Sequence, residues 1–154
     1  MLMLVAAPEV SSAPPIFADG GTRYACGKSC RETQLVCVSD AQRSMPAGLT
    51  SQDIAANLPW GQTDYWFMIG AIADRPESGI VDSQRVSGPA LVSFEGLDWV
   101  WADYDLPAAK GTDLAGSLVM WPDGDQMAML RCSFRAGANA RTMIEEVASS
   151  LRHP

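Results

Sequence analysis

Histidine is almost missing from this sequence, which holds only His153 among its 154 residues. Serine and cysteine nucleophiles normally need a base within hydrogen-bond reach, and histidine is the usual base. His153 is the penultimate residue, and chain ends commonly fray, so this side chain is a poor candidate for accurate positioning. The sequence therefore argues against His-based hydrolases and excludes metal sites that are built from several histidines.

Basic residues are also scarce. Eleven Lys and Arg stand against 18 Asp and Glu, which gives a formal net charge of -7. A negative protein repels phosphate backbones and anionic lipid headgroups, so nucleic acid and membrane surfaces are poor partners. The sequence also lacks an apolar run of the roughly 18 to 20 residues that a membrane-spanning helix needs. We expect a soluble, acidic protein without a membrane span.

A phosphate-binding loop is not matched either, although residues 21–29 come close to the pattern G-x4-G-K-S/T. Counting back from Gly27 puts Thr22 where the leading glycine must stand, and Gly21 lies one residue too far away. The backbone amides of such a loop hold phosphate only in the correct register. We interpret the segment as an irregular loop that carries cysteines.

The length of the chain predicts one domain, because single domains usually span roughly 100 to 200 residues. The hydrophobic content of 47% is enough to build a core. Residues 1–7 are apolar and are followed by small residues and prolines, as at the end of a secretory signal, although no basic start precedes them. We expect residues 1–22 to be a signal-peptide remnant or a mobile arm, and residues 23–154 to form the domain.

Four cysteines, an even set, favour two disulfides in an exported protein, with the pairing left open: Cys26, Cys30, Cys37 and Cys132. One alternative is four buried thiols in a cytoplasmic protein. Another is zinc, but the spacing C-x3-C-x6-C with a distant fourth cysteine matches no common zinc motif. We predict a periplasmic or secreted protein without metal or cofactor. Cys37 and Cys132 should lie in strands at the core, and Cys26 and Cys30 in the preceding loop.

The order of the predicted elements is typical of an α+β protein. Thr50 or Ser51 can cap a short helix that ends before Pro59. The sequence Pro122-Asp123-Gly124-Asp125 predicts a hairpin turn, because Asp-Gly tolerates positive φ. We predict a short strand at residues 33–38 before this helix. After the helix we predict an antiparallel meander whose strands are residues 65–72, 90–94, 98–106, 115–121 and 126–134.

A C-terminal helix should close the domain by packing on the sheet. Its apolar residues recur at helical spacing and form one buried stripe: Ala140, Met143, Ile144, Val147 and Leu151. The helix ends in the sequence Ser149-Ser150-Leu151-Arg152. With the acidic strand 98–106 and the hairpin 115–134, this order resembles the end of PsbP-like or DcrB-like domains. The resemblance implies an αβα sandwich that serves as a non-catalytic binding or accessory module.

One strand carries the candidate contact residues. Side chains alternate between the faces of a strand, so Trp99, Trp101, Asp103 and Asp105 share one face. Two large aromatics beside two acids suit a protein contact, a sugar-stacking platform or, less well, carboxylate catalysis. The alternative is that a helix or loop covers this face. The methionines Met120, Met127 and Met129 allow a similar choice between core and contact surface, and we favour core.

The predicted function is an exported, non-enzymatic protein-binding domain, such as an accessory factor, an inhibitor or an immunity-type protein. We expect Trp99 and Trp101 to anchor a partner, and Asp103 and Asp105 to select a basic surface on it. No catalytic residue is predicted. The alternatives are a carbohydrate-binding module and a small hydrolase that uses carboxylates.

Overall fold

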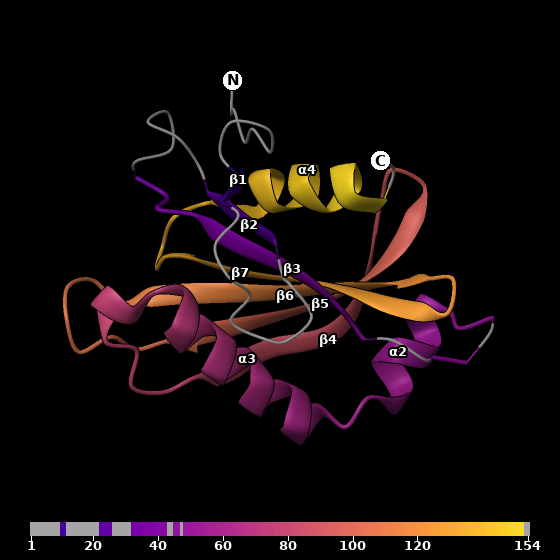
Figure 1. Cartoon of the computed structure of the whole chain (residues 1–154), viewed down its shortest axis with the longest axis horizontal. Coiled ribbons are helices and arrows are strands. Elements are labelled where there is room, and N and C mark those ends of the chain that lie inside the picture. Colours follow the sequence, from indigo (N-terminus) through magenta and orange to yellow (C-terminus); the bar gives the residue numbers. More distant parts are fainter. Residues whose placement is uncertain (1–9, 12–21, 26–31, 43–44, 47, 153–154) are drawn as a thin grey trace.

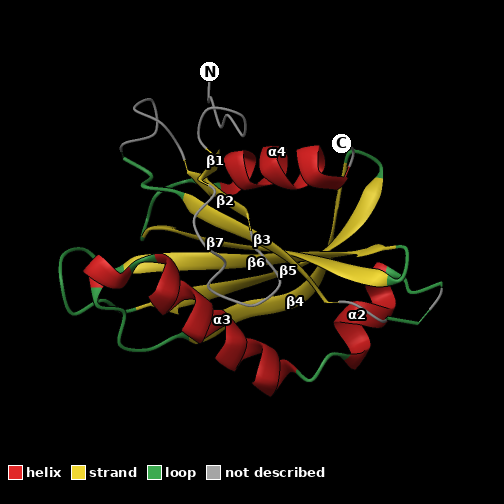
Figure 2. Ribbon diagram, viewed as in Figure 1, coloured by secondary structure: helices red, strands yellow, loops and turns green. Residues whose placement is uncertain are grey.

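The computed structural model of the chain describes residues 10–11, 22–25, 32–42, 45–46 and 48–152. Within these ranges, one antiparallel sheet carries helices on both of its faces (Figures 1 and 2). Its strand order is β1-β2-β3-β7-β6-β5-β4. The strands are β1 (Val10–Ser11), β2 (Thr22–Ala25), β3 (Val36–Gln42), β4 (Gln84–Phe94), β5 (Leu97–Leu106), β6 (Leu114–Asp123) and β7 (Gln126–Arg135).

Helix α4 (Arg141–Arg152) covers one face of the sheet, while α2 (Ser51–Asn57) and α3 (Trp60–Asp74) lie on the other face (Figure 2). A short 3-10 helix, η2 (Pro76–Ser78), follows α3. The predicted α+β class, with an antiparallel sheet and a C-terminal helix, is confirmed. None of the described helices is long and apolar enough to cross a membrane.

The N-terminal part of the described chain already belongs to the sheet. Strand β1 pairs with β2, and Val10 lies opposite Tyr24. Strand β2 itself begins at Thr22. Part of the segment 1–22, which we expected to be outside the domain, therefore contributes a strand to its edge.

The hairpin of β6 and β7 has the predicted turn. Asp123 pairs with Gln126, and Gly124 between them has a φ of 62°, which glycine adopts without strain. Strands β5, β6 and β7 begin and end within two residues of the predicted ranges. Strand β3 begins later than predicted, at Val36, because Gln34 has a φ of 53°, outside the extended range of a strand.

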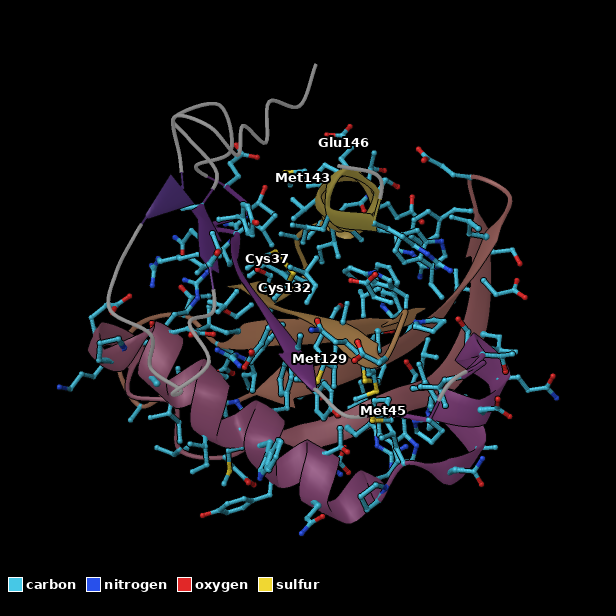
Figure 3. All side chains as sticks on the ribbon, turned by 45° about the vertical axis from the view of Figure 1, so that its right-hand side comes forward. Cys37, Met45, Met129, Cys132, Met143 and Glu146 are labelled. Carbon is cyan, nitrogen blue, oxygen red and sulfur yellow. A yellow bond between two sulfur atoms is a disulfide. The ribbon has the colours of Figure 1, made fainter. Side chains whose placement is uncertain are left out.

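The core under α4 holds the residues that the helical stripe predicted. Ile144 and Val147 are 1% and 4% exposed, so their predicted burial is confirmed, while Leu151 at the end of the stripe is partly buried. Beneath the helix, Cys37 of β3 and Cys132 of β7 lie directly opposite each other and form a disulfide (Figure 3). Both cysteines are fully buried, as predicted. Cys26 and Cys30 lie outside the described residues.

Helix α2 was predicted correctly, but the strand predicted at residues 65–72 is wrong. Thr50 caps α2 through a capping box: the Asp53 backbone N–H donates to the Thr50 hydroxyl oxygen, and the Thr50 backbone N–H donates to the Asp53 carboxylate. Residues 65–72 lie instead within α3. A continuous apolar run fits a buried strand and a buried helix equally well, because neither shows a clear period.

Helix α3 crosses the strands rather than running along them. Its first turns reach β4 and β5 through Asp64, its middle meets β5 and β6 through Phe67, and its end reaches β7 through Asp74. Phe67 stacks on Tyr104 of β5 with ring centroids 3.9 Å apart. A Cβ atom at Gly116 would come within 2.5 Å of the Phe67 ring. The missing side chain at Gly116 thus lets α3 approach the sheet closely.

Candidate contact face on helix α3

The structure first corrects the predicted contact strand. Trp99 and Trp101 are 0% and 3% exposed. Trp99 stacks on Phe94 at 4.3 Å and meets Trp121 edge-on at 5.2 Å. A buried pair of indoles cannot anchor an outside partner, so the prediction of an exposed aromatic face at these residues is wrong. The alternative, a covering helix, describes them correctly, because α4 lies over this side of β5.

Two arginines of α4 hold this arrangement in place. The guanidinium of Arg141 lies 4.1 Å from the ring centre of Trp101, and that of Arg152 lies 4.7 Å from the ring centre of Trp99. Arg152 also donates to the carbonyl oxygen of Asp98 at 2.9 Å. Cations over indole faces attract the aromatic quadrupole. They therefore fasten both ends of α4 to β5.

The two acids of the predicted face have different surroundings. Asp103 accepts hydrogen bonds from the Trp101 indole at 2.9 Å, from Ser117 at 2.8 Å and from Ser87 at 2.9 Å. These donors satisfy its carboxylate within the domain. Asp105 is exposed. The structure thus does not bring Trp99, Trp101, Asp103 and Asp105 together as one outward surface.

The described residues also offer no candidate metal site. Within the described ranges, no three His, Cys, Asp or Glu side chains lie together in a way that would hold a metal ion.

The predicted core role is confirmed for Met120 and Met127, which are 0% and 3% exposed, while Met129 packs against the same core from a partly buried position. Figure 3 shows Met129 on the side of the sheet where Met45 also lies.

A pocket of about 350 Å³ opens between α2 and the loop before it. Most of its lining is apolar: Met45, Pro46, Gly48, Leu49, Ile54 and Leu58, with Asp53 and Asn57 as the polar members. Asp53 is already engaged with the backbone of Thr50 at 3.1 Å. Asn57 donates to the carbonyl oxygen of Asp53 at 3.1 Å. The polar groups of this pocket thus serve the capping of α2.

Helix α3 turns its acidic residues toward the sheet. Asp64 accepts a hydrogen bond from the Tyr104 hydroxyl at 2.7 Å and pairs with Arg85 at 3.1 Å. Arg85 also lies over the ring of Trp60, 5.2 Å from its centre. Burial, followed by the hydrogen bond to Asp64, raises the pKa of Tyr104 well above its ordinary value. Tyr104 therefore stays protonated and keeps donating to Asp64.

The end of α3 is held by a buried ion pair. Asp74 accepts from Arg131 through two parallel bonds, Nε to Oδ2 at 2.7 Å and Nη2 to Oδ1 at 2.9 Å. The side chains of Asp74 and Arg131 are 1% and 9% exposed. A Cβ atom at Gly70 would collide with the guanidinium of Arg131, so this glycine makes room for the pair. Bidentate geometry of this kind compensates both charges where water is excluded.

Arg75, the residue after Asp74, also attaches the end of α3 to β7. Arg75 donates to the Ser133 hydroxyl at 2.7 Å and to the Ser133 carbonyl at 2.9 Å, and it also donates to the carbonyl of Gln34. Burial lowers the pKa of the Arg75 guanidinium. The acidic and basic groups at both ends of α3 are thus turned inward and satisfied by the sheet.

The outward side of α3 is mostly apolar, with Gln62 as an exposed polar residue near its start. Tyr65, Trp66 and Ile69 are 58%, 55% and 37% exposed, and their spacing places them on one side of the helix. We call these three residues the α3 face. A surface helix usually points its polar residues at water and its apolar ones at the core. Helix α3 exposes apolar side chains while its charged residues contact the sheet.

The segment that carries the α3 face has no positive charge of its own. Residues 45–74 contain three Asp and neither Lys nor Arg. Arg85, the cation that reaches the start of α3, is paired with Asp64. The sequence missed the α3 face because residues 65–72 were assigned to a strand. The signal that could have found it is length, since 60–74 holds no proline and is too long for a typical strand.

Comparison with known proteins adds no relative. No model of a protein family matches the chain, and no curated protein matches its sequence. The assignment of a function therefore rests on the geometry of α3 and its surroundings.

Proposed function

We propose that the protein is a non-enzymatic protein-binding domain and that it contacts its partner through the α3 face. The supporting observation is the inverted polarity of α3, whose Tyr65 and Trp66 are more than half exposed while Asp64 and Asp74 face the sheet. Contiguous exposed apolar groups mark interaction sites, and aromatic residues contribute most of the binding energy of protein interfaces. Tyr65 and Trp66 are the anchors of this contact.

The partner is expected to present an apolar groove with basic groups at its rim. The absence of Lys and Arg from residues 45–74 and the net charge of -7 favour a positive partner surface and disfavour phosphate or anionic lipid. A sugar ligand would need polar side chains beside the aromatics to recognise its hydroxyls. On α3 the carboxylates Asp64 and Asp74 are engaged by the sheet, which leaves Gln62, one turn before Trp66, as an exposed polar side chain beside the aromatics. This arrangement favours a protein partner over a carbohydrate.

We also propose that the protein works outside the cytoplasm, in the periplasm or as a secreted protein. The disulfide between Cys37 and Cys132 supports this location, because such bonds persist in oxidising compartments. Accessory factor, inhibitor and immunity-type protein all remain roles of the proposed kind. The resemblance of residues 96–152 to PsbP-like or DcrB-like domains agrees with a non-catalytic role.

The test compares Trp66→Ala with Val81→Ala, since Val81 is also exposed, at 65%, but lies outside α3. A partner isolated on the wild-type chain should bind Val81→Ala equally well. Trp66→Ala should weaken the binding measured by calorimetry by at least about 2 kcal/mol, or roughly 30-fold in Kd. Both variants should keep wild-type stability in urea. A partner that binds Trp66→Ala and Tyr65→Ala with unchanged Kd would falsify the proposal.

A further inference from the structure

Strand β4 forms one end of the sheet. It is last in the strand order, pairs with β5 on one side, and no described strand pairs with its other side. Leu91 and Val86 on this strand are 46% and 52% exposed. An edge strand presents unpaired N–H and C=O groups, which can add a further strand unless a bulge, a proline or a charge prevents it.

The first half of β4 is protected in this way. Its register with β5 shifts between Arg85 and Ser87 and again between Ser87 and Ala90, and Pro89 lies in the second shift. A proline and a distorted register both prevent regular addition of a strand. The edge is therefore closed to pairing before residue 90.

The second half of β4 has no such protection. From Ala90 opposite Trp101 to Phe94 opposite Leu97, every residue pairs in regular register with β5. Residues 90–94 read Ala-Leu-Val-Ser-Phe and contain no charge, proline or glycine. The uncharged part of the strand extends further, because residues 86–94 contain no charged side chain at all. A regular, neutral edge of this length is suited to pairing with another strand.

We propose that residues 90–94 pair with the same residues of a second copy of this chain, antiparallel, around a twofold axis at Val92. In this register Ala90 lies opposite Phe94 of the second copy, and Leu91 lies opposite Ser93. Phe94 and Leu91 thus each meet a small side chain, and the two Val92 residues meet at the axis. Val92 and Phe94 already pack against the core under α4, so their pairing extends that core across the axis.

The absence of charge from residues 86–94 allows a second copy to be the occupant. Two chains of net charge -7 repel each other, so they can associate only where neither presents charge. In the proposed register Glu95 of one chain faces Pro89 of the other. The two Glu95 residues stay six residues apart along the strands, or about 20 Å, which is beyond the Debye length of about 8 Å at physiological salt. The twofold contact also closes on itself and leaves no free edge at β4.

This inference is independent of the proposed function, because it concerns a different surface. The strand pairing continues the sheet across the axis, so both copies carry α3 on the same side of the joined sheet. A dimer would therefore display two α3 faces in one direction.

The experiment is sedimentation velocity of the full chain over a wide range of concentration, with Leu91→Lys as the test variant. Val81→Lys is the matched control, since it makes the same kind of change at another exposed apolar residue. Wild type and Val81→Lys should show the same monomer–dimer equilibrium. Leu91→Lys should raise the dissociation constant at least about 10-fold while its circular dichroism stays unchanged, because a charge on an edge strand opposes pairing.

A second measurement locates the contact. Hydrogen exchange of the amides in 90–94 should slow as the concentration rises through the dimerisation range, and it should not do so in Leu91→Lys. A wild-type chain that stays monomeric at every concentration overturns the inference. So does a dimer that survives Leu91→Lys or is lost in Trp66→Ala, because the contact would then lie elsewhere. A dimer that persists in Trp66→Ala leaves the α3 proposal to be decided by its own binding test.

Discussion

The carboxylate of Asp64 accepts a 2.7 Å hydrogen bond from the buried hydroxyl of Tyr104. Tyr104 is 1% exposed and also stacks on Phe67, so one residue of β5 receives both a polar and an aromatic contact from α3. These contacts fix the rotation of the helix about its axis. Because Asp64 and Phe67 face the sheet, Tyr65, Trp66 and Ile69 must face outward.

The raised pKa of Tyr104 predicts a loss of stability at high pH. The folded chain holds Tyr104 protonated at pH values where the unfolded chain releases the proton. This contribution is complete below the ordinary tyrosine pKa of about 10 and is lost as pH rises above it, by up to about 1.4 kcal/mol per pH unit. Tyr104→Phe should flatten the alkaline fall of the unfolding free energy, measured in urea.

Tyr65→Phe is the control for this prediction, because Tyr65 is exposed on the outward side of α3, away from Tyr104 of β5. It should keep the alkaline profile of the wild type. An equal flattening in both variants would assign the pH dependence to a group other than Tyr104.

Substitution by alanine should change the free energy of unfolding differently at two glycines. Gly116→Ala places a methyl group 2.5 Å from the Phe67 ring and should destabilise the fold by about 1 to 3 kcal/mol, because the packed helix must shift. Gly61→Ala in α3 meets no atom within 4 Å and should be neutral or stabilising by up to about 1 kcal/mol, through helix propensity. Urea unfolding of both variants measures the difference. Equal effects would show that α3 does not rest on Gly116.

The tryptophans should divide into two classes. Trp99→Ala and Trp101→Ala remove buried rings from beneath α4 and should each cost about 3 to 5 kcal/mol of unfolding free energy. Trp66→Ala removes an exposed ring and should change it by no more than about 0.5 kcal/mol. Chemical denaturation followed by circular dichroism gives all three values. A large loss in Trp66→Ala would mean that the α3 face stabilises the fold itself.

The closing helix offers a simpler contrast. Ile144 is 1% exposed, so Ile144→Ala should cost about 2 to 5 kcal/mol. Thr142 is exposed on the same helix, and Thr142→Ala should stay within about 0.5 kcal/mol of the wild type. Thermal and urea unfolding should rank the two variants in this order. A change under about 0.5 kcal/mol in Ile144→Ala would contradict the packing of α4 on the sheet.

Sequence reasoning succeeded where a single segment contains its own signal. The stripe that includes Ile144 and Val147 repeats at helical spacing, and the Asp123-Gly124 pair favours its turn whatever surrounds it. The core position of Cys132 followed from its strand. The disulfide partner of Cys132 could not be predicted in this way, because only the pairing of β3 with β7 brings Cys37 opposite it.

Sequence reasoning failed where the position of a side chain depends on another element that packs against it. Strand alternation correctly placed Trp99 and Trp101 on one face of β5, but nothing local tells which layer covers that face. In α3 the usual signal is reversed, since Asp64 and Asp74 find their partners Tyr104 and Arg131 on the sheet. A pattern that assumes polar residues face water cannot identify such a helix.

The disulfide between Cys37 and Cys132 also makes most of the chain a covalent ring. The ring encloses α2, α3 and strands β4 to β6, whereas α4 follows outside the ring. A single proteolytic cut in the exposed loop at residues 107–113 opens the backbone but leaves the two fragments joined. A protein nicked there would keep the mass of the intact chain plus one water, and would separate into fragments only after reduction.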